Sequence, residues 1–199
     1  MNHVDKVAVC SRSFSKNPVL RADLLEKYKN VTFNDAGEKL SGESLIKFLR
    51  GHNKAITGLE RIDESVLKEL SELKVIGKYG VGLDMIDFAA MRKYKKKLGW
   101  VGGVNRRSVS EMVISFAVAM LRHIPAAQKE VQGGTWKQHV GGLLSGRTVG
   151  IIGCGFIGKD LVQLLQPWVC TILANDILDF PEFYARYRVI PVGLEELLQ

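Results

Sequence analysis

The stretch Arg147–Asp176 decides the fold, and its sequence is RTVGIIGCGFIGKDLVQLLQPWVCTILAND. A short apolar run at 149–152 is typical of a parallel strand that is buried on both faces. Three glycines follow within Gly153–Gly158, and apolar residues at 161–165 then recur at the spacing of a helix. A second apolar run at 169–174 leads to the closing aspartate. The stretch therefore predicts a strand, a tight turn, a helix and a second strand.

The three glycines have separate physical roles in a G-x-G-x-x-G pattern of the kind that binds a dinucleotide. We expect Gly153 to permit the sharp bend after the strand. Gly155 has no Cβ, so a pyrophosphate can approach its backbone closely, and Gly158 lets the helix pack tightly on the sheet. The first helical turn then points free N–H groups and the positive end of its dipole at the pyrophosphate.

Asp176 lies 18 residues beyond Gly158, at the end of the second predicted strand. A carboxylate at this place in a dinucleotide-binding unit accepts hydrogen bonds from the adenosine ribose hydroxyls and repels a 2′-phosphate. The pattern therefore predicts NAD rather than NADP as the cofactor. Two weaker alternatives are a glycine turn without a ligand and a redox role for Cys154 at the helix N-terminus.

The composition is that of a globular protein, with 199 residues, 46% of them apolar and 25% charged. No stretch approaches 18 consecutive apolar residues, so we expect no membrane span. The three cysteines form no C-x-x-C pair and the N-terminus lacks the apolar core of a signal peptide, so we expect a cytoplasmic protein with reduced thiols. We expect no metal site.

The chain is basic, with a net charge of +7 and its densest basic run at Arg92–Lys97. This run has two interpretations, a nucleic-acid patch or a solvated helix end. We favour the helix end and expect no nucleic-acid partner, because the run is short and carries no nucleic-acid motif. A basic balance also suits an anionic cofactor and an anionic substrate.

Residues 1–103 alternate between short apolar runs and helical patterns, which is typical of a parallel sheet with right-handed crossovers. The expected strands are Lys6–Cys10, Val31–Phe33, Lys54–Thr57, Lys74–Gly77 and Gly99–Val101. We therefore predict a flavodoxin-like α/β domain with five parallel strands and helices on both faces.

Residues 104–199 form the second predicted domain, and a boundary is marked by Gly102 and Gly103. Ser108 and Glu111 fit a capping box, and an apolar stripe follows along the helix 109–122. That stripe is either a core face or a subunit interface, and both interpretations stay open. With a further strand expected at 188–191, the domain supplies only the first three strands of a six-stranded Rossmann sheet.

Three stretches together resemble one family, the D-isomer-specific 2-hydroxyacid dehydrogenases of the phosphoglycerate dehydrogenase-like kind. Lys78–Asp87 is similar to the glycine loop of the family, and Val104–Glu111 to the segment that enters its long interface helix. Gly142–Gly158 is similar to its cofactor signature. The order and spacing of all three agree, so the resemblance covers nearly the whole chain.

The resemblance implies a substrate domain at 1–103 and an incomplete NAD-binding domain at 104–199. In the substrate domain, the backbone N–H groups of Gly80, Val81 and Gly82 would bind the substrate carboxylate. Met85 departs from the family, which usually has Asn there, and this puts the local hydrogen bonding of the loop in doubt.

For the cofactor, the resemblance implies that Phe156 and Ile157 offer N–H groups to the pyrophosphate and that Asp176 binds the adenosine ribose. Val81 and Val109 would line the nicotinamide side. The family also implies a homodimer, which would form through the apolar helix 109–122.

The implied reaction is hydride transfer between C2 of a D-2-hydroxy acid and NAD, with an Arg, a Glu and a His as catalytic groups in the second half of the cofactor domain. No such motif includes His3, His52, His123 or His139. We therefore assign no catalytic residue, and we expect a truncated chain without turnover of its own. The alternative is a non-catalytic NAD-binding sensor or interaction module.

Overall fold

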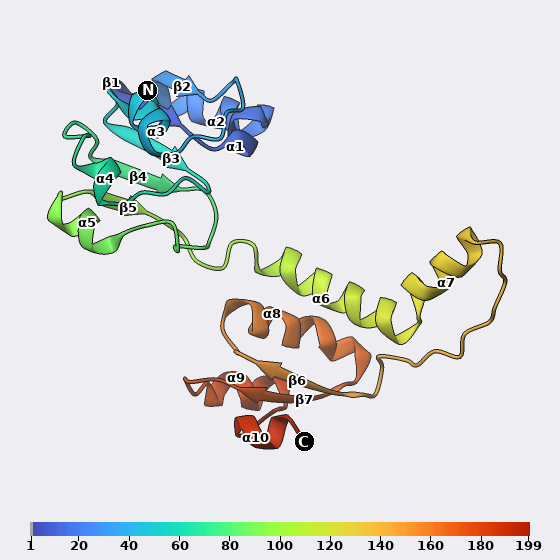
Figure 1. Cartoon of the computed structure of the whole chain (residues 1–199). Helices are drawn as coiled ribbons and strands as arrows, with labels where there is room; N and C mark the ends of the chain where they lie inside the picture. Colours follow the sequence, from blue (N-terminus) through green and yellow to red (C-terminus); the bar gives the residue numbers. More distant parts are fainter. Residues whose placement is uncertain (1) are drawn as a thin grey trace. The chain divides into compact units, whose positions relative to one another are not determined.

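The computed structural model describes the backbone of residues 2–199 and the side chains from residue 4 onward. The chain divides into two compact units, Met1–Gly102 and Gly103–Gln199, and Figure 1 shows their elements. Each unit has its own hydrophobic core. The roles expected for the two units remain predictions, and each unit is described by itself.

The first unit is built on a five-stranded parallel sheet, which confirms the predicted fold class. Its strands are β1 (Asn2–Val9), β2 (Tyr28–Phe33), β3 (Lys54–Thr57), β4 (Val75–Lys78) and β5 (Lys97–Gly99). They lie in the order β2-β1-β3-β4-β5, which is the flavodoxin-like order with a switch point between β1 and β3. In such sheets, ligands bind beyond the carboxyl ends of the strands at the switch point.

Short polar caps set the starts of several helices in the first unit. The helices are α1 (Arg12–Lys16), α2 (Pro18–Lys27), α3 (Gly42–Leu49), α4 (Glu64–Leu67) and α5 (Phe88–Lys93). The side chains of Asn17, Asp63 and Asp87 accept N–H bonds at the starts of α2, α4 and α5. Strand β5 begins two residues before the predicted Gly99, because the Lys97 N–H already donates to the Lys74 carbonyl next to β4.

The second unit contains a three-stranded parallel sheet in the order β6-β7-β8. Its sheet elements are β6 (Thr148–Ile152), α8 (Phe156–Leu165), β7 (Thr171–Asn175), α9 (Pro181–Tyr187), β8 (Val189–Pro191) and α10 (Leu194–Leu197). A short 3-10 helix, η1 (Gln166–Trp168), follows α8. Within the described residues β6 pairs only with β7, as the expected half of a Rossmann sheet requires.

The long helix α6 (Arg106–Leu121) begins three residues before the expected 109, and the predicted capping box is wrong. Asn105 is the N-cap, so Ser108 lies inside the first turn, where its hydroxyl donates to the Asn105 carbonyl. The cause is that helical hydrogen bonding already starts at Asn105, whose carbonyl accepts from the Val109 N–H at 3.2 Å.

The apolar stripe of α6 divides into two faces. Ala117 and Leu121 pack on the core of the second unit, and Figure 1 shows α6 running alongside α8. Phe116 and Met120 are instead 61% and 73% exposed. The next helix, α7 (Ile124–Gln132), has no buried residue and lies away from the β6–β8 sheet (Figure 1). One helix therefore has both a core face and an uncovered apolar face.

Among the described residues, no single helix has the length and apolar character needed to cross a bilayer. Only α6 and α7 taken together meet that test, as a pair bent by 61°.

Candidate functional site

The glycine turn between β6 and α8 has the geometry that its three glycines were expected to provide. Gly153 has a φ of +92°, in the region that favours glycine, so the chain can bend sharply after β6. No heavy atom lies within 4 Å of the place where a Cβ of Gly155 would stand. A Cβ on Gly158 would overlap the Gly153 carbonyl oxygen, so glycine is needed there for α8 to approach the turn.

The N-terminus of α8 opens at this turn without a side-chain cap. Gly155 is the N-cap residue and, being glycine, has no side chain that could accept a hydrogen bond from the first N–H groups of the helix. The helix makes its first bond back to Gly155 from the Lys159 N–H, at 3.0 Å. The N–H groups of Phe156 and Ile157 therefore form part of an uncapped helix N-terminus, which favours an anion.

Asp176 lies directly after β7, and its carboxylate reaches the glycine turn. Its Oδ2 accepts from the Cys154 N–H at 2.6 Å, and its Oδ1 accepts from the Leu178 N–H at 2.9 Å. The Leu178 bond contributes most to lowering the pKa of Asp176, and the Cys154 bond and the positive charge of Lys159 act in the same direction. An ionised carboxylate is thus fixed beside the open Gly155.

The structure disfavours the redox role considered for Cys154. Its side chain is fully buried, and this burial raises the pKa of the thiol, although the charge of Lys159 acts in the opposite direction. A buried thiol with a raised pKa is a poor nucleophile, so Cys154 fills space behind the turn.

We expect the three free cysteines to differ in their rates of alkylation. Cys10 and Cys154 are buried, and burial raises the pKa of both thiols, whereas Cys170 is half-buried. Iodoacetamide at neutral pH should therefore modify Cys170 first, with mass spectrometry of tryptic peptides as the readout. Fast labelling of Cys154 that NAD suppresses would instead support a reactive thiol in the turn.

In the first unit, a pocket of about 890 Å³ opens at the carboxyl ends of the strands beside the glycine loop. The loop follows β4, and Gly80 adopts a φ of +123°. The pocket lining includes Gly80, Val81 and Gly82, together with the cationic side chains of Arg12, Lys16, Lys39, Arg61 and Lys78. Its acidic members are Glu60 and Asp84. The lining therefore favours an anionic ligand.

Two contacts shape the floor of this pocket. The Lys78 ammonium group donates to the Gly58 carbonyl, and the Gly58 N–H donates to Glu60 at 2.6 Å. A Cβ on Gly58 would lie 3.1 Å from the Ser11 hydroxyl, so the segments after β1 and β3 meet closely here.

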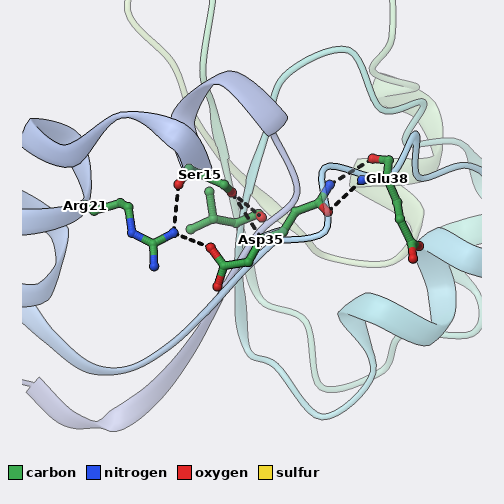
Figure 2. A network of polar contacts seen from close by, with 6 residues as sticks. Ser15, Arg21, Asp35 and Glu38 are labelled. Atoms are coloured by element: carbon green, nitrogen blue, oxygen red, sulfur yellow. Dashed lines mark hydrogen bonds and ion pairs between the residues drawn. The ribbon is translucent and has the colours of Figure 1, made fainter.

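A polar network fixes the loop that carries Lys39 into the pocket wall. Figure 2 shows the Arg21 guanidinium group between the Ser15 carbonyl and the Asp35 carboxylate, to both of which it donates. The buried Asn34 side chain donates to the Glu38 carbonyl at 2.9 Å and accepts from the Glu38 N–H at 3.0 Å. These bonds hold the segment after β2 in one conformation.

The structure brings some of the expected site residues together. The three glycines of the turn, Phe156, Ile157 and Asp176 form one cluster, whose Asp176–Cys154 hydrogen bond spans 22 residues of sequence. Val109 lies in the first turns of α6, in the same unit as that cluster. Val81 belongs to the other unit, where its carbonyl accepts from the Trp100 indole N–H at 3.1 Å.

Two features were missed by sequence reasoning. One is the cationic pocket lining, whose members come from helix α1, the end of strand β4 and the segments that follow β2 and β3, and share no motif. The other is Asp160, which is buried and joins α8 to α6 through an ion pair with Arg107 at 3.1 Å. An acidic residue in an apolar helical stripe was the available signal for this pair.

Two of the histidines make side-chain hydrogen bonds within their own units. His52 contacts the Thr32 hydroxyl at 2.9 Å, and His139 contacts the Glu130 carboxylate at 2.6 Å. The side chain of His3 lies outside the described residues. From residue 4 onward, no group of three or more metal-ligating side chains is found together.

A family model described as D-isomer specific 2-hydroxyacid dehydrogenase, catalytic domain, matches residues 7–186. D-3-phosphoglycerate dehydrogenase of Homo sapiens is 29% identical over 189 residues, which are 90% of this chain and 35% of that protein. The protein of the same name from Bacillus subtilis is 28% identical, over 92% of this chain and 33% of its own length. The chain thus spans about a third of the length of these curated relatives.

Solved structures show the same fold. An NAD⁺-bound 3-phosphoglycerate dehydrogenase of Entamoeba histolytica has a TM-score of 0.75 at 25% identity, covering 97% of this chain and 59% of its own. The apo-structure of D-lactate dehydrogenase from Escherichia coli has a TM-score of 0.79 at 22% identity, covering 96% of this chain and 61% of its own.

Proposed function

Because the chain belongs to the D-isomer specific 2-hydroxyacid dehydrogenase family, we propose that it forms the substrate-binding unit and the first half of the NAD-binding unit of an oxidoreductase. The reaction would transfer a hydride between C2 of a D-2-hydroxy acid and NAD. The observation that carries this proposal is the hydrogen bond from the Cys154 N–H to Asp176, which sets a carboxylate beside the open Gly155.

In this proposal residues 1–103 are the substrate domain. The backbone N–H groups of Gly80, Val81 and Gly82 bind the carboxylate of a 2-hydroxy or 2-oxo acid. The cationic lining of the adjoining pocket supports an anionic substrate, because positive side chains raise the local concentration of anions.

Residues 104–199 would be the NAD-binding domain. When bound, NAD supplies the nicotinamide ring that accepts or returns the hydride. Phe156 and Ile157 would donate N–H groups to the pyrophosphate, above Gly153, Gly155 and Gly158. Asp176 would accept from the adenosine ribose hydroxyls, while Val81 and Val109 would line the nicotinamide side.

We assign no acid/base residue in this chain. Hydride transfer to a 2-oxo acid needs a proton donor and a group that polarises the carbonyl. Since the chain spans about a third of its curated relatives, we propose that the activity belongs to a longer parent protein, of which this chain is a truncated form.

We also propose a homodimer that forms through the helix 109–122. The exposed Met112, Val113, Phe116 and Met120 on α6 support it, because an uncovered apolar face of this kind is typical of an interface. A cytoplasmic location is supported by the three free thiols, since oxidising compartments favour disulfides.

A nuclear magnetic resonance titration of the ¹⁵N-labelled 199-residue chain tests the proposed function. Pyruvate, a small 2-oxo acid, should shift the amide signals of Gly80, Val81 and Gly82, and NAD should shift those of Phe156 and Ile157. The physical reason is that each ligand would accept hydrogen bonds from these N–H groups.

The control ligand for this titration is methyl pyruvate, which lacks the carboxylate and should leave the first set of signals unchanged. Shifts confined to other surfaces, or equal shifts with methyl pyruvate, would contradict the assigned sites.

A further inference from the structure

Lys159 has an unusual place next to the glycine turn. It follows Gly158 directly, in the first turn of α8, and it is half-buried. Its Nζ lies 3.3 Å from the centroid of the Phe180 ring and 5.6 Å from that of Phe183. Both rings belong to the segment that follows β7 and Asp176, so the ammonium group is held against that segment by cation–π contacts.

The charge of Lys159 is not neutralised by a direct partner. Among the side chains of residues 4–199, no ion pair at 4.0 Å or less includes Lys159, whether with Asp176 or with Asp179 of the same loop. Its electrostatic effect nevertheless reaches both sides of the turn, since it acts to lower the pKa of Asp176 and of Cys154. Lys159 is therefore a cation near the expected ribose site, and its ammonium group can still form an ion pair with a bound anion.

We propose that Lys159 is a cofactor-specificity residue, whose ammonium group offsets the repulsion between Asp176 and a 2′-phosphate on the adenosine ribose. This inference rests on the proposed function, because it requires the ribose to lie on Asp176. NAD remains the preferred cofactor. Lys159 lowers the ratio of the NADP to the NAD dissociation constant, so that NADP also binds.

The physical basis is the balance of two fixed charges at one position. A carboxylate that accepts from the ribose hydroxyls lies close to a 2′-phosphate, and the repulsion between the two negative charges weakens the binding of NADP. An ammonium group beside the same carboxylate attracts that phosphate and can donate to its oxygens. This role could not be predicted from the sequence, because no Arg follows Asp176 directly and the cation comes from the preceding helix, α8.

Isothermal titration calorimetry of the 199-residue chain with NAD and with NADP tests the inference. In Lys159→Gln the ratio of the NADP to the NAD dissociation constant should rise about fivefold, the effect of losing one solvent-screened charge pair. In Lys159→Arg the ratio should stay near that of the unmodified chain. In Asp176→Ala it should fall, because the repulsive group is removed.

Two further variants keep this test specific. Lys129→Gln makes the same charge change on α7 and should leave the ratio unchanged. Phe180→Leu removes the ring that holds the ammonium group and should raise the ratio, by less than Lys159→Gln does. Circular dichroism of each variant reports on folding, and Phe180→Leu gives an independent answer if Lys159→Gln does not fold.

The outcomes separate the inference from the proposed function. A ratio that changes in Asp176→Ala but not in Lys159→Gln or Phe180→Leu would overturn the role of Lys159 alone. Absence of binding by either dinucleotide, or a ratio that Asp176→Ala leaves unchanged, would overturn the ribose assignment and with it the inference. An equal rise in Lys129→Gln would show a general charge effect and would also overturn it.

Discussion

Gly155→Val is expected to abolish NAD binding while the second unit stays folded. No heavy atom lies within 4 Å of the Cβ position of Gly155, so a larger side chain has room there without displacing the fold. The same open space is where a pyrophosphate would approach the backbone, and valine would fill it. Losing the phosphate hydrogen bonds should weaken binding by about 100-fold or more, as measured by calorimetry.

The matched control for this substitution is Gly193→Val. Gly193 is also an N-cap glycine with no heavy atom near its Cβ position, but it precedes α10 rather than α8. This variant should bind NAD as the unmodified chain does. Equal affinity of Gly155→Val and the unmodified chain would remove the pyrophosphate from the glycine turn.

Gly158→Ala is expected to destabilise the second unit, in contrast to substitutions at Gly155. The added Cβ would overlap the Gly153 carbonyl oxygen and would lie 3.4 Å from Cγ2 of Ile151. The first of these neighbours is backbone, so α8 or the turn must shift. We expect the free energy of unfolding to fall by about 3 kcal/mol, as is typical of an overpacked site. Urea titration followed by hydrogen exchange at the amides of β6 and β7 measures it.

Gly155→Ala is the control for that measurement, because it adds the same atom to open space in the same turn. It should change the unfolding free energy by less than about 1 kcal/mol. If the two alanine variants are equally stable, Gly158 is not required for the packing of α8.

Local chemistry explains why much of the fold could be predicted. Asn17, Asp63 and Asp87 are polar residues placed before helical patterns, and each accepts an N–H bond at the start of its helix. The turn Gly153–Gly158 was equally readable, because its three glycines lie between a strand pattern and a helix pattern. These features depend on residues only a few positions apart, so they can be predicted from the local sequence.

Features that depend on distant partners could not be predicted in the same way. The division of α6 into a packed and an exposed face is set by α8, which is distant in sequence: the Ser110 hydroxyl, for example, donates to the Ile157 carbonyl 47 residues later. The predicted start of α6 was wrong because Ser108 and Glu111 match a capping pattern, whereas the helix already begins at Arg106 with Asn105 as its N-cap. The cationic pocket lining and the position of Lys159 against Phe180 likewise require the folded chain.

A crystal structure of the 199-residue chain with ADP-ribose, the part of NAD that the proposed half-site would bind, tests the proposed cofactor site most directly. We predict phosphate oxygens within hydrogen-bonding distance of the Phe156 and Ile157 N–H groups, and ribose hydroxyls that donate to the Asp176 carboxylate. ADP-ribose bound elsewhere on the chain, with the space above Gly155 empty, would contradict this prediction.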